Sequence, residues 1–198
     1  MAVAGVAGLL LAAGGGRRFG MPKALAPHRG GLLVEHALRA LAGCAPRVVV
    51  LGAGAERVPP LDATTVLNPD WPTGLGSSLR VGLAALTGTD AVAAVVLPVD
   101  TPGIGVAAVR RLAALAAPDA LARATYRGEP GHPVLIGRAH WAGVAELAVG
   151  DAGARDYLAR HPVTGVPCAD IADGADVDRP EQLTEQCPRG TQGDTHAG

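Results

Sequence analysis

Short apolar runs alternate with amphipathic stretches along most of this chain of 198 residues. The apolar run Val3–Leu11 ends before a group of glycines, as expected of a strand that is buried on both faces of a sheet. The stretch Leu32–Leu41 then spaces its apolar residues for one face of a helix. The alternation continues with strands expected at 48–51, 64–67 and 92–97 and helices at 77–86 and 106–116. Repeated strand–helix–strand units predict a mostly parallel sheet with helices on both faces, a Rossmann-like three-layer α/β/α sandwich.

The alternation loosens after residue 120, where two strands are expected side by side. Ala122–Tyr126 and Pro133–Ile136 flank the short connection 127–131, which is typical of a hairpin or of a loop at a site. We therefore expect an antiparallel strand in the C-terminal half of the sheet. Further helices are expected at 139–147, 154–159 and 180–185, and a last strand at 163–166. We predict a single domain over residues 1–187 and a small, polar, glycine-rich tail at 188–198 that is disordered.

Composition and charge exclude several classes of protein. The formal net charge of −1 gives no electrostatic footprint for nucleic-acid binding. Uninterrupted apolar runs stay below the roughly 18 to 20 residues that span a bilayer, and the apolar start lacks the basic segment of a signal peptide. Three widely separated cysteines give neither a disulfide framework nor a zinc signature. We therefore expect a cytoplasmic protein that binds neither membranes nor nucleic acid.

The loop after the first expected strand carries the strongest functional signal. Gly14, Gly15 and Gly16 let backbone amides approach a ligand closely, and Lys23, the single lysine against sixteen arginines, ends the loop. A compact ammonium beside bare amides suits a polyphosphate, although a lone lysine in a surface loop would give the same pattern. Two familiar phosphate motifs fail. A P-loop requires Ser or Thr after its lysine, and the dinucleotide fingerprint requires glycine where Phe19 stands.

Asp100 follows the expected strand 92–97 and lies between Pro98 and Pro102. In open α/β sheets the carboxyl ends of the strands meet in one ligand crevice, so Asp100 should face the glycine-rich loop. A carboxylate there could hold Mg²⁺, which takes one or two carboxylates and otherwise water and phosphate oxygens. The alternative is an aspartate that only accepts hydrogen bonds within a turn.

The order of these residues resembles the MobA-like nucleotidyltransferase family, which includes the enzymes that load a nucleotide onto molybdopterin. The family's loop is similar to Leu-Ala-Ala-Gly-x-Gly-x-Arg-x-Gly-x-Pro-Lys at 11–23, and its metal segment to Pro-x-Asp-x-Pro at 98–102. Segments at 68–82, 131–135 and 150–155 resemble the molybdenum cofactor cytidylyltransferases in particular. The resemblance covers residues 5 to 184. It implies transfer of CMP from CTP to Mo-molybdopterin, with Mg²⁺ as cofactor and pyrophosphate as product.

The resemblance also implies a role for each site residue. Lys23, Arg18 and Asp100 would act in catalysis, and Asp178, in the segment Asp-Val-Asp-Arg-Pro-Glu-Gln-Leu, would complete the metal site beside Asp100. Acceptor contacts would come from His132, Asp151 and Arg155. Nucleotide contacts would come from Leu11, Ala12, Ala13, Gly14, Gly15, Gly16, Arg18, Lys23, Asn68, Gly76, Ser77, Ser78 and Asp100.

Structural roles stay open for some of these residues. Ser77 and Ser78 could cap the helix that follows them, and Asp178 could cap the helix expected at 180–185. The chain also departs from the family's pattern at Gly76, where serine is usual, and at two positions near Asp178, where Arg179 and Gln182 replace threonine and an acid. Because base choice depends on a few such contacts, the departure at Gly76 leaves the donor nucleotide open.

Several alternative functions follow from these departures. GTP could replace CTP, or the acceptor could be a different small phosphorylated molecule. A non-catalytic nucleotide-binding module of the same fold is a second class, disfavoured by the two candidate metal carboxylates. An NAD-dependent oxidoreductase is a third class, disfavoured by the failed dinucleotide fingerprint. If the cytidylyl reading holds, a molybdoenzyme of the xanthine dehydrogenase type is the candidate recipient of the product.

Overall fold

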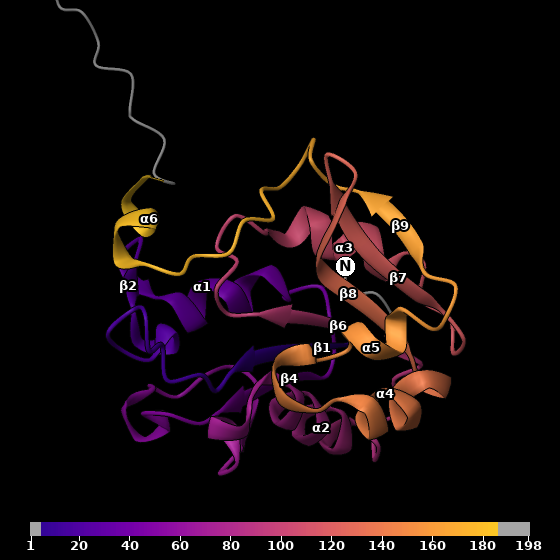
Figure 1. Cartoon of the computed structure of the whole chain (residues 1–198), viewed down its shortest axis with the longest axis horizontal. Helices are drawn as coiled ribbons and strands as arrows, with labels where there is room; N and C mark the ends of the chain where they lie inside the picture. The colour runs from indigo at the N-terminus through magenta and orange to yellow at the C-terminus, as the bar shows by residue number, and fades with distance from the viewer. Residues whose placement is uncertain (1–4, 186–198) are drawn as a thin grey trace, which may run out of the picture.

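The computed structural model of the protein describes residues 5–185. A seven-stranded sheet with the order β5-β4-β1-β6-β8-β7-β9 forms its centre (Figure 1). Two further strands of two residues each pair as a separate hairpin, β2 (Pro27–His28) with β3 (Gly31–Leu32). The strands of the large sheet are β1 (Val6–Ala12), β4 (Arg47–Leu51), β5 (Thr64–Leu67), β6 (Ala93–Pro98), β7 (Leu121–Tyr126), β8 (Glu129–Gly137) and β9 (Thr164–Pro167).

Strand β8 runs against its neighbours. It pairs antiparallel with both β6 and β7, whereas the other pairs in the sheet are parallel. The β7–β8 hairpin turns at Arg127 and Gly128, whose φ angles are 54° and 89°. Two successive residues with positive φ give the turn whose twist suits a two-residue hairpin. The predicted antiparallel strand in the C-terminal half of a mostly parallel sheet is therefore confirmed.

Helices cover both faces of the sheet (Figure 1). Each helical layer closes over its own apolar core, built mainly from Ala, Val and Leu side chains. Gly82 brings α2 close to β1, because a Cβ at this position would run into the side chain of Leu9. The three-layer α/β/α sandwich is thus confirmed. One face carries α1 (Leu33–Ala40) and α3 (Val106–Ala113), and the other carries α2 (Leu75–Leu86), α4 (Trp141–Leu147) and α5 (Arg155–Leu158).

A topological switch point lies between β1 and β6. The chain passes from β1 to β4 and β5 on one side, and then returns through α2 to β6 on the other side of β1. The loops that follow Ala12 and Pro98 meet there, and the amide of Val99 donates to the carbonyl of Leu11 at 3.0 Å. Ligands of open α/β sheets bind at such points, outside the carboxyl ends of the strands.

After β9 the chain crosses to this same edge of the sheet. Val177 is fully buried, and its amide donates to the carbonyl of Asp100 at 2.8 Å. Tyr126 on β7 packs so closely against Gly174 that a Cβ there would collide with the tyrosine ring. The Tyr126 hydroxyl also donates to the carbonyl of His132 at 2.8 Å. These contacts fix the segment that leads into α6 (Pro180–Glu185).

The predicted strands and helices all occur within the described residues. No helix of residues 5–185 combines the length and apolarity needed to cross a bilayer. The predicted tail at 188–198 and the domain boundary at residue 187 lie outside the described residues.

Candidate functional site

The loop between β1 and the 3₁₀ helix η1 (Lys23–Leu25) is folded tightly on itself. The carbonyl of Gly16 accepts hydrogen bonds from the amides of Phe19 at 2.9 Å and Gly20 at 2.8 Å. Gly16 has a φ of 62°, and a Cβ there would collide with the carbonyl oxygen of Met21. Glycine is therefore required at this position, because it has neither the Cβ nor the penalty at positive φ.

The open side of this loop presents backbone amides. Within the part of the chain that the structure describes, the amides of Gly14, Gly15 and Gly16 donate to no backbone carbonyl. The ring of Trp71 lies against the loop, since a Cβ on Gly15 would come within 2.8 Å of it. Free amides in a glycine-rich turn form a concavity that binds anions, so the loop can cradle phosphate.

Lys23 joins the two aspartates that were predicted to bind metal. Its Nζ donates to Asp100 Oδ2 at 2.9 Å and to Asp178 Oδ1 at 3.1 Å, and the lysine side chain is only 14% exposed. Arg18 pairs with the other oxygen of Asp178, with 3.1 Å between Nη1 and Oδ2, from an exposed position. Three segments that are far apart in the sequence thus bring two cations and two carboxylates together at the switch point.

Asp178 stays ionised in this environment. The hydrogen bond from Lys23, aided by the positive charges of Lys23, Arg18 and Arg179, lowers the pKa of the Asp178 carboxyl below its usual value. Gln182 holds the backbone before α6, because its Oε1 accepts the amides of Asp178 and Arg179, each at 2.8 Å. Each oxygen of the Asp178 carboxylate thus contacts a cation, Oδ1 that of Lys23 and Oδ2 that of Arg18.

These groups line a pocket of about 370 Å³ at the carboxyl ends of β1 and β6. The volume falls within the roughly 300–1,000 Å³ that is usual for small-molecule sites. Ala12 lies beneath the pocket, buried in the core at the end of β1. The predicted site residues that line the pocket are Leu11, Ala13, Gly14, Gly15, Gly16, Arg18, Lys23, Ser78, Asp100, Asp151 and Asp178.

The turn before α2 contributes a wall that the sequence analysis did not assign. Trp71, Pro72 and Gly74 line the pocket from this turn, and Leu75 lines it from the first position of α2. Aromatic residues make up only 3% of the chain, so a tryptophan outside the expected strands and helices was a usable signal. Arg17, whose role was not assigned, also lines the pocket.

Asn68, Gly76 and Ser77 lie behind this wall. The Asn68 side chain is buried and donates to the hydroxyls of Ser77 at 2.9 Å and Ser78 at 3.0 Å. Gly76 packs against the backbone of Ala148, so that a serine side chain would have no room there. This contact explains the departure from the family's usual serine. The structure gives these residues a bracing role at the start of α2.

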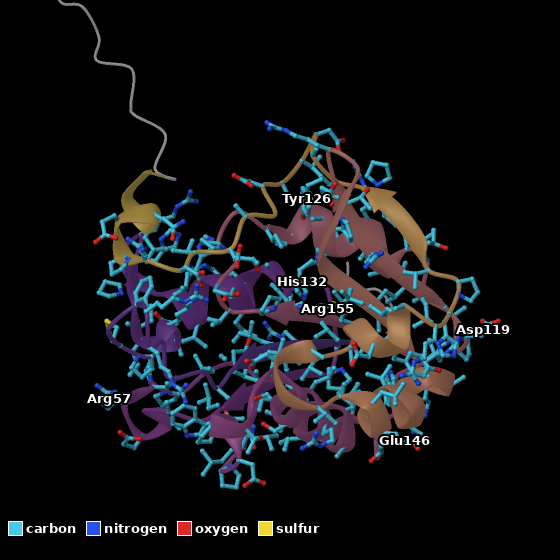
Figure 2. The ribbon with its side chains drawn as sticks, in the orientation of Figure 1. Arg57, Asp119, Tyr126, His132, Glu146 and Arg155 are labelled. Carbon is cyan, nitrogen blue, oxygen red and sulfur yellow. The ribbon has the colours of Figure 1, made fainter. Side chains whose placement is uncertain are left out.

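The three residues predicted to contact the acceptor are spread more widely. Asp151 lines the pocket, whereas His132 and Arg155 do not. Figure 2 shows His132 on β8 and Arg155 at the start of α5 near the centre of the view. Burial lowers the pKa of His132, while the negative charges of Asp100 and Asp176 act in the opposite direction. Burial therefore favours the neutral form of the His132 ring despite the nearby charge of Asp100.

The donor set fits a magnesium ion. Asp100 and Asp178 supply hard oxygen donors that converge on a single cationic atom. Among residues 5–185, no group of three or more His, Cys, Asp or Glu side chains is arranged to hold a metal alone. Mg²⁺ is usually bound through one or two carboxylates together with substrate phosphates and water. A phosphate ligand in the pocket would complete this set.

The fold and the site together define an α/β protein built to bind a phosphorylated ligand at its topological switch point. The chain belongs to the family of the MobA-like NTP transferase domain, whose model matches residues 8–165. The predicted family is therefore confirmed.

Relatives and solved structures extend this comparison. A nicotine blue oxidoreductase from Paenarthrobacter nicotinovorans is 40% identical over 194 residues, which cover 90% of this chain and 94% of that protein. A molybdenum cofactor guanylyltransferase from Rhodobacter capsulatus is 34% identical over 141 residues, 69% of this chain and 65% of that protein.

Two mycobacterial structures share the architecture over nearly their whole length. The homologue of Rv0371c from Mycobacterium sp. strain JC1 has a TM-score of 0.81 at 28% identity, covering 93% of this chain and 98% of that one. Rv0371c of Mycobacterium tuberculosis H37Rv, solved in complex with manganese, has a TM-score of 0.75 at 27% identity, covering 92% and 100%.

Proposed function

We propose that the protein is a Mg²⁺-dependent nucleotidyltransferase that moves CMP from CTP to Mo-molybdopterin and releases pyrophosphate. The observation that carries this proposal is the convergence of Lys23, Asp100 and Asp178 beside the glycine-rich loop. Membership of the MobA-like NTP transferase family supports the transfer chemistry. The guanylyltransferase relative supports a molybdopterin acceptor, and the manganese complex of Rv0371c supports a divalent metal.

In this reaction a phosphate oxygen of the acceptor attacks the α-phosphorus of CTP, and the bond from that phosphorus to the pyrophosphate breaks. Asp100 and Asp178 would hold Mg²⁺, which when bound would supply positive charge to the reacting phosphates. Lys23 and Arg18 offset the charge that builds on the α-phosphate and the departing pyrophosphate. Because the acceptor phosphate is already an anion, the site needs positioning more than a strong base.

The pocket wall at Trp71, together with the neighbouring lining residue Ser78, is proposed to receive the base and ribose of the nucleotide. His132, Asp151 and Arg155 are proposed to lie on the acceptor side. GTP is the rival donor, because a guanylyltransferase is among the relatives. A molybdoenzyme of the xanthine dehydrogenase type is the proposed recipient of the product, and the cytoplasm the proposed location.

A thermal-shift series tests the donor. The protein is heated with CTP, GTP, ATP and UTP, each with and without Mg²⁺. A ligand at 100 times its dissociation constant adds about 2.7 kcal/mol to the free energy of unfolding. We expect the largest shift with CTP and Mg²⁺, a smaller one in Asp100→Asn, and pyrophosphate release when Mo-molybdopterin is added. A larger shift with GTP would reassign the donor, and no shift with any nucleotide would refute the transferase proposal.

The 40% identity to a nicotine blue oxidoreductase favours a second candidate function, the reduction of nicotine blue. This activity is tested by following the oxidation of NADH or NADPH with nicotine blue as acceptor. Reduction of nicotine blue, together with no response to nucleoside triphosphates, would refute the transferase proposal in favour of this second function. Stabilisation by CTP without pyrophosphate release would instead indicate a non-catalytic nucleotide-binding module.

A further inference from the structure

The ammonium of Lys23 occupies the position between the two proposed metal ligands. Its Nζ contacts Asp100 Oδ2 at 2.9 Å and Asp178 Oδ1 at 3.1 Å. The side chain is 14% exposed, so water competes weakly for these contacts. In the absence of other ligands, Lys23 neutralises a pair of carboxylates that would otherwise repel each other.

A divalent ion that bridged Asp100 Oδ2 and Asp178 Oδ1 would take the place of the lysine ammonium. Mg²⁺ binds oxygen at about 2.0–2.1 Å and requires nearly ideal octahedral geometry. Asp100 Oδ2 and Asp178 Oδ1, the two oxygens that converge on one point, both accept hydrogen bonds from Lys23. An ammonium held against the same oxygens would also repel the ion strongly at so short a distance.

The lysine is mounted so that its side chain can move while its backbone stays fixed. Lys23 begins η1, where the amide of Leu25 donates to the carbonyl of Pro22 at 3.0 Å and that of Ala26 to the carbonyl of Lys23 at 3.1 Å. Ala24 and Leu25 are buried in or against the core. The flexible four-carbon stem is therefore the part that can redirect the charge, and the glycine-rich loop lines the same pocket.

We propose that Lys23 is an internal counter-cation that keeps divalent metal out of the Asp100–Asp178 pair until a triphosphate enters the loop. The triphosphate gives the ammonium a new anionic partner, which frees Asp100 Oδ2 and Asp178 Oδ1 for the metal. Nucleotide and metal then bind together, and metal alone binds weakly. This inference rests on the proposed nucleotidyl transfer, because it assigns Lys23 a second role at the same site.

Removal of the Lys23 ammonium should raise the affinity of the nucleotide-free protein for a divalent metal. Free Mn²⁺ is measured by electron paramagnetic resonance while the nucleotide-free protein is titrated with MnCl₂. Lys23→Met should bind Mn²⁺ at least about tenfold more tightly than the wild type, because two carboxylates lose their competing cation. Lys23→Gln, which keeps a polar side chain, should behave in the same way. Circular dichroism checks that each variant is folded.

Two controls locate the effect. Arg17→Met removes one positive charge from the same pocket without removing a partner of either carboxylate, and should change Mn²⁺ affinity much less. The double variant Lys23→Met with Asp100→Asn should lose the gain. Unchanged or weaker Mn²⁺ binding in both Lys23 variants would overturn the inference, as would a gain that survives in the double variant. Either result can coexist with CTP-dependent pyrophosphate release by the wild type, so the inference and the proposed function fail separately.

Discussion

Alanine substitution should destabilise the protein least at Gly14, more at Gly20 and most at Gly16. The three glycines differ in what a side chain would meet. A Cβ on Gly14 has free space and Gly14 has no positive φ, whereas Gly20 has the same free space with a φ of 82°. Gly16 combines a φ of 62° with a collision against the carbonyl oxygen of Met21. The series therefore separates backbone strain from steric overlap.

The magnitudes follow from these differences. Gly14→Ala should change the free energy of unfolding by no more than about 0.5 kcal/mol. Gly20→Ala should cost about 1–2 kcal/mol, the penalty of the left-handed region for a residue with a Cβ. Gly16→Ala should cost about 2–4 kcal/mol, because the collision is with backbone and no rotamer relieves it.

Urea unfolding followed by circular dichroism measures these free energies, provided that the denaturant slope stays constant across the series. Gly14→Ala also provides a functional arm. Gly14 lines the pocket, so its methyl group should weaken CTP binding by about tenfold, the equivalent of one lost hydrogen bond to a charged ligand, while the fold stays intact. Equal losses of stability at all three positions, or a Gly16→Ala variant as stable as Gly20→Ala, would refute the reasoning.

Three further predictions concern the supports of the site. Asn68→Ala removes a buried amide that donates to two hydroxyls of α2, and thermal unfolding should show a loss of about 2–3 kcal/mol; no loss would mean that the hydroxyls find other partners. Tyr126→Phe removes the hydrogen bond to the His132 carbonyl and should cost about 1 kcal/mol in urea unfolding, with wild-type stability as the contrary result. Because Lys23 lowers the pKa of Asp178 in the folded state, this contribution to stability is present above the ordinary carboxyl pKa and is lost as the pH falls below about 4. Asp178→Asn should therefore lessen the fall in stability on acidification, by a small amount because the carboxylate is partly exposed, and an unchanged pH profile would contradict this.

The sheet and the loop after β1 were predictable because their signals are local. The runs that became β1 and β6 are apolar along their length, as burial on both faces requires. The short connection around Arg127 separates two runs that are typical of strands, and this pattern predicts a hairpin. The convergence of Lys23 with Asp100 followed from a general rule, that the carboxyl ends of the strands meet in one crevice.

The features that sequence did not reveal depend on contacts between distant segments. Asn68 stays a predicted nucleotide contact, but the bonds that its buried amide donates to Ser77 and Ser78 were not expected, since polarity alone does not distinguish a ligand contact from an internal brace. Gly76 is explained only by the backbone of Ala148, far along the chain. The hairpin of β2 and β3 has strands of two residues, too short for an alternating pattern to be visible.

The contact between Lys23 and Asp178 joins residues that are 155 positions apart. During synthesis the N-terminal part of a chain is available to fold first, so β1 can pair with β4 and β6 and carry the glycine-rich loop before Asp178 has been made. The anion-binding loop can therefore arise early, whereas the carboxylate pair is completed only when the segment after β9 has been made and has crossed the sheet. A nascent chain would thus present the glycine-rich loop before it contains the second carboxylate of the pair.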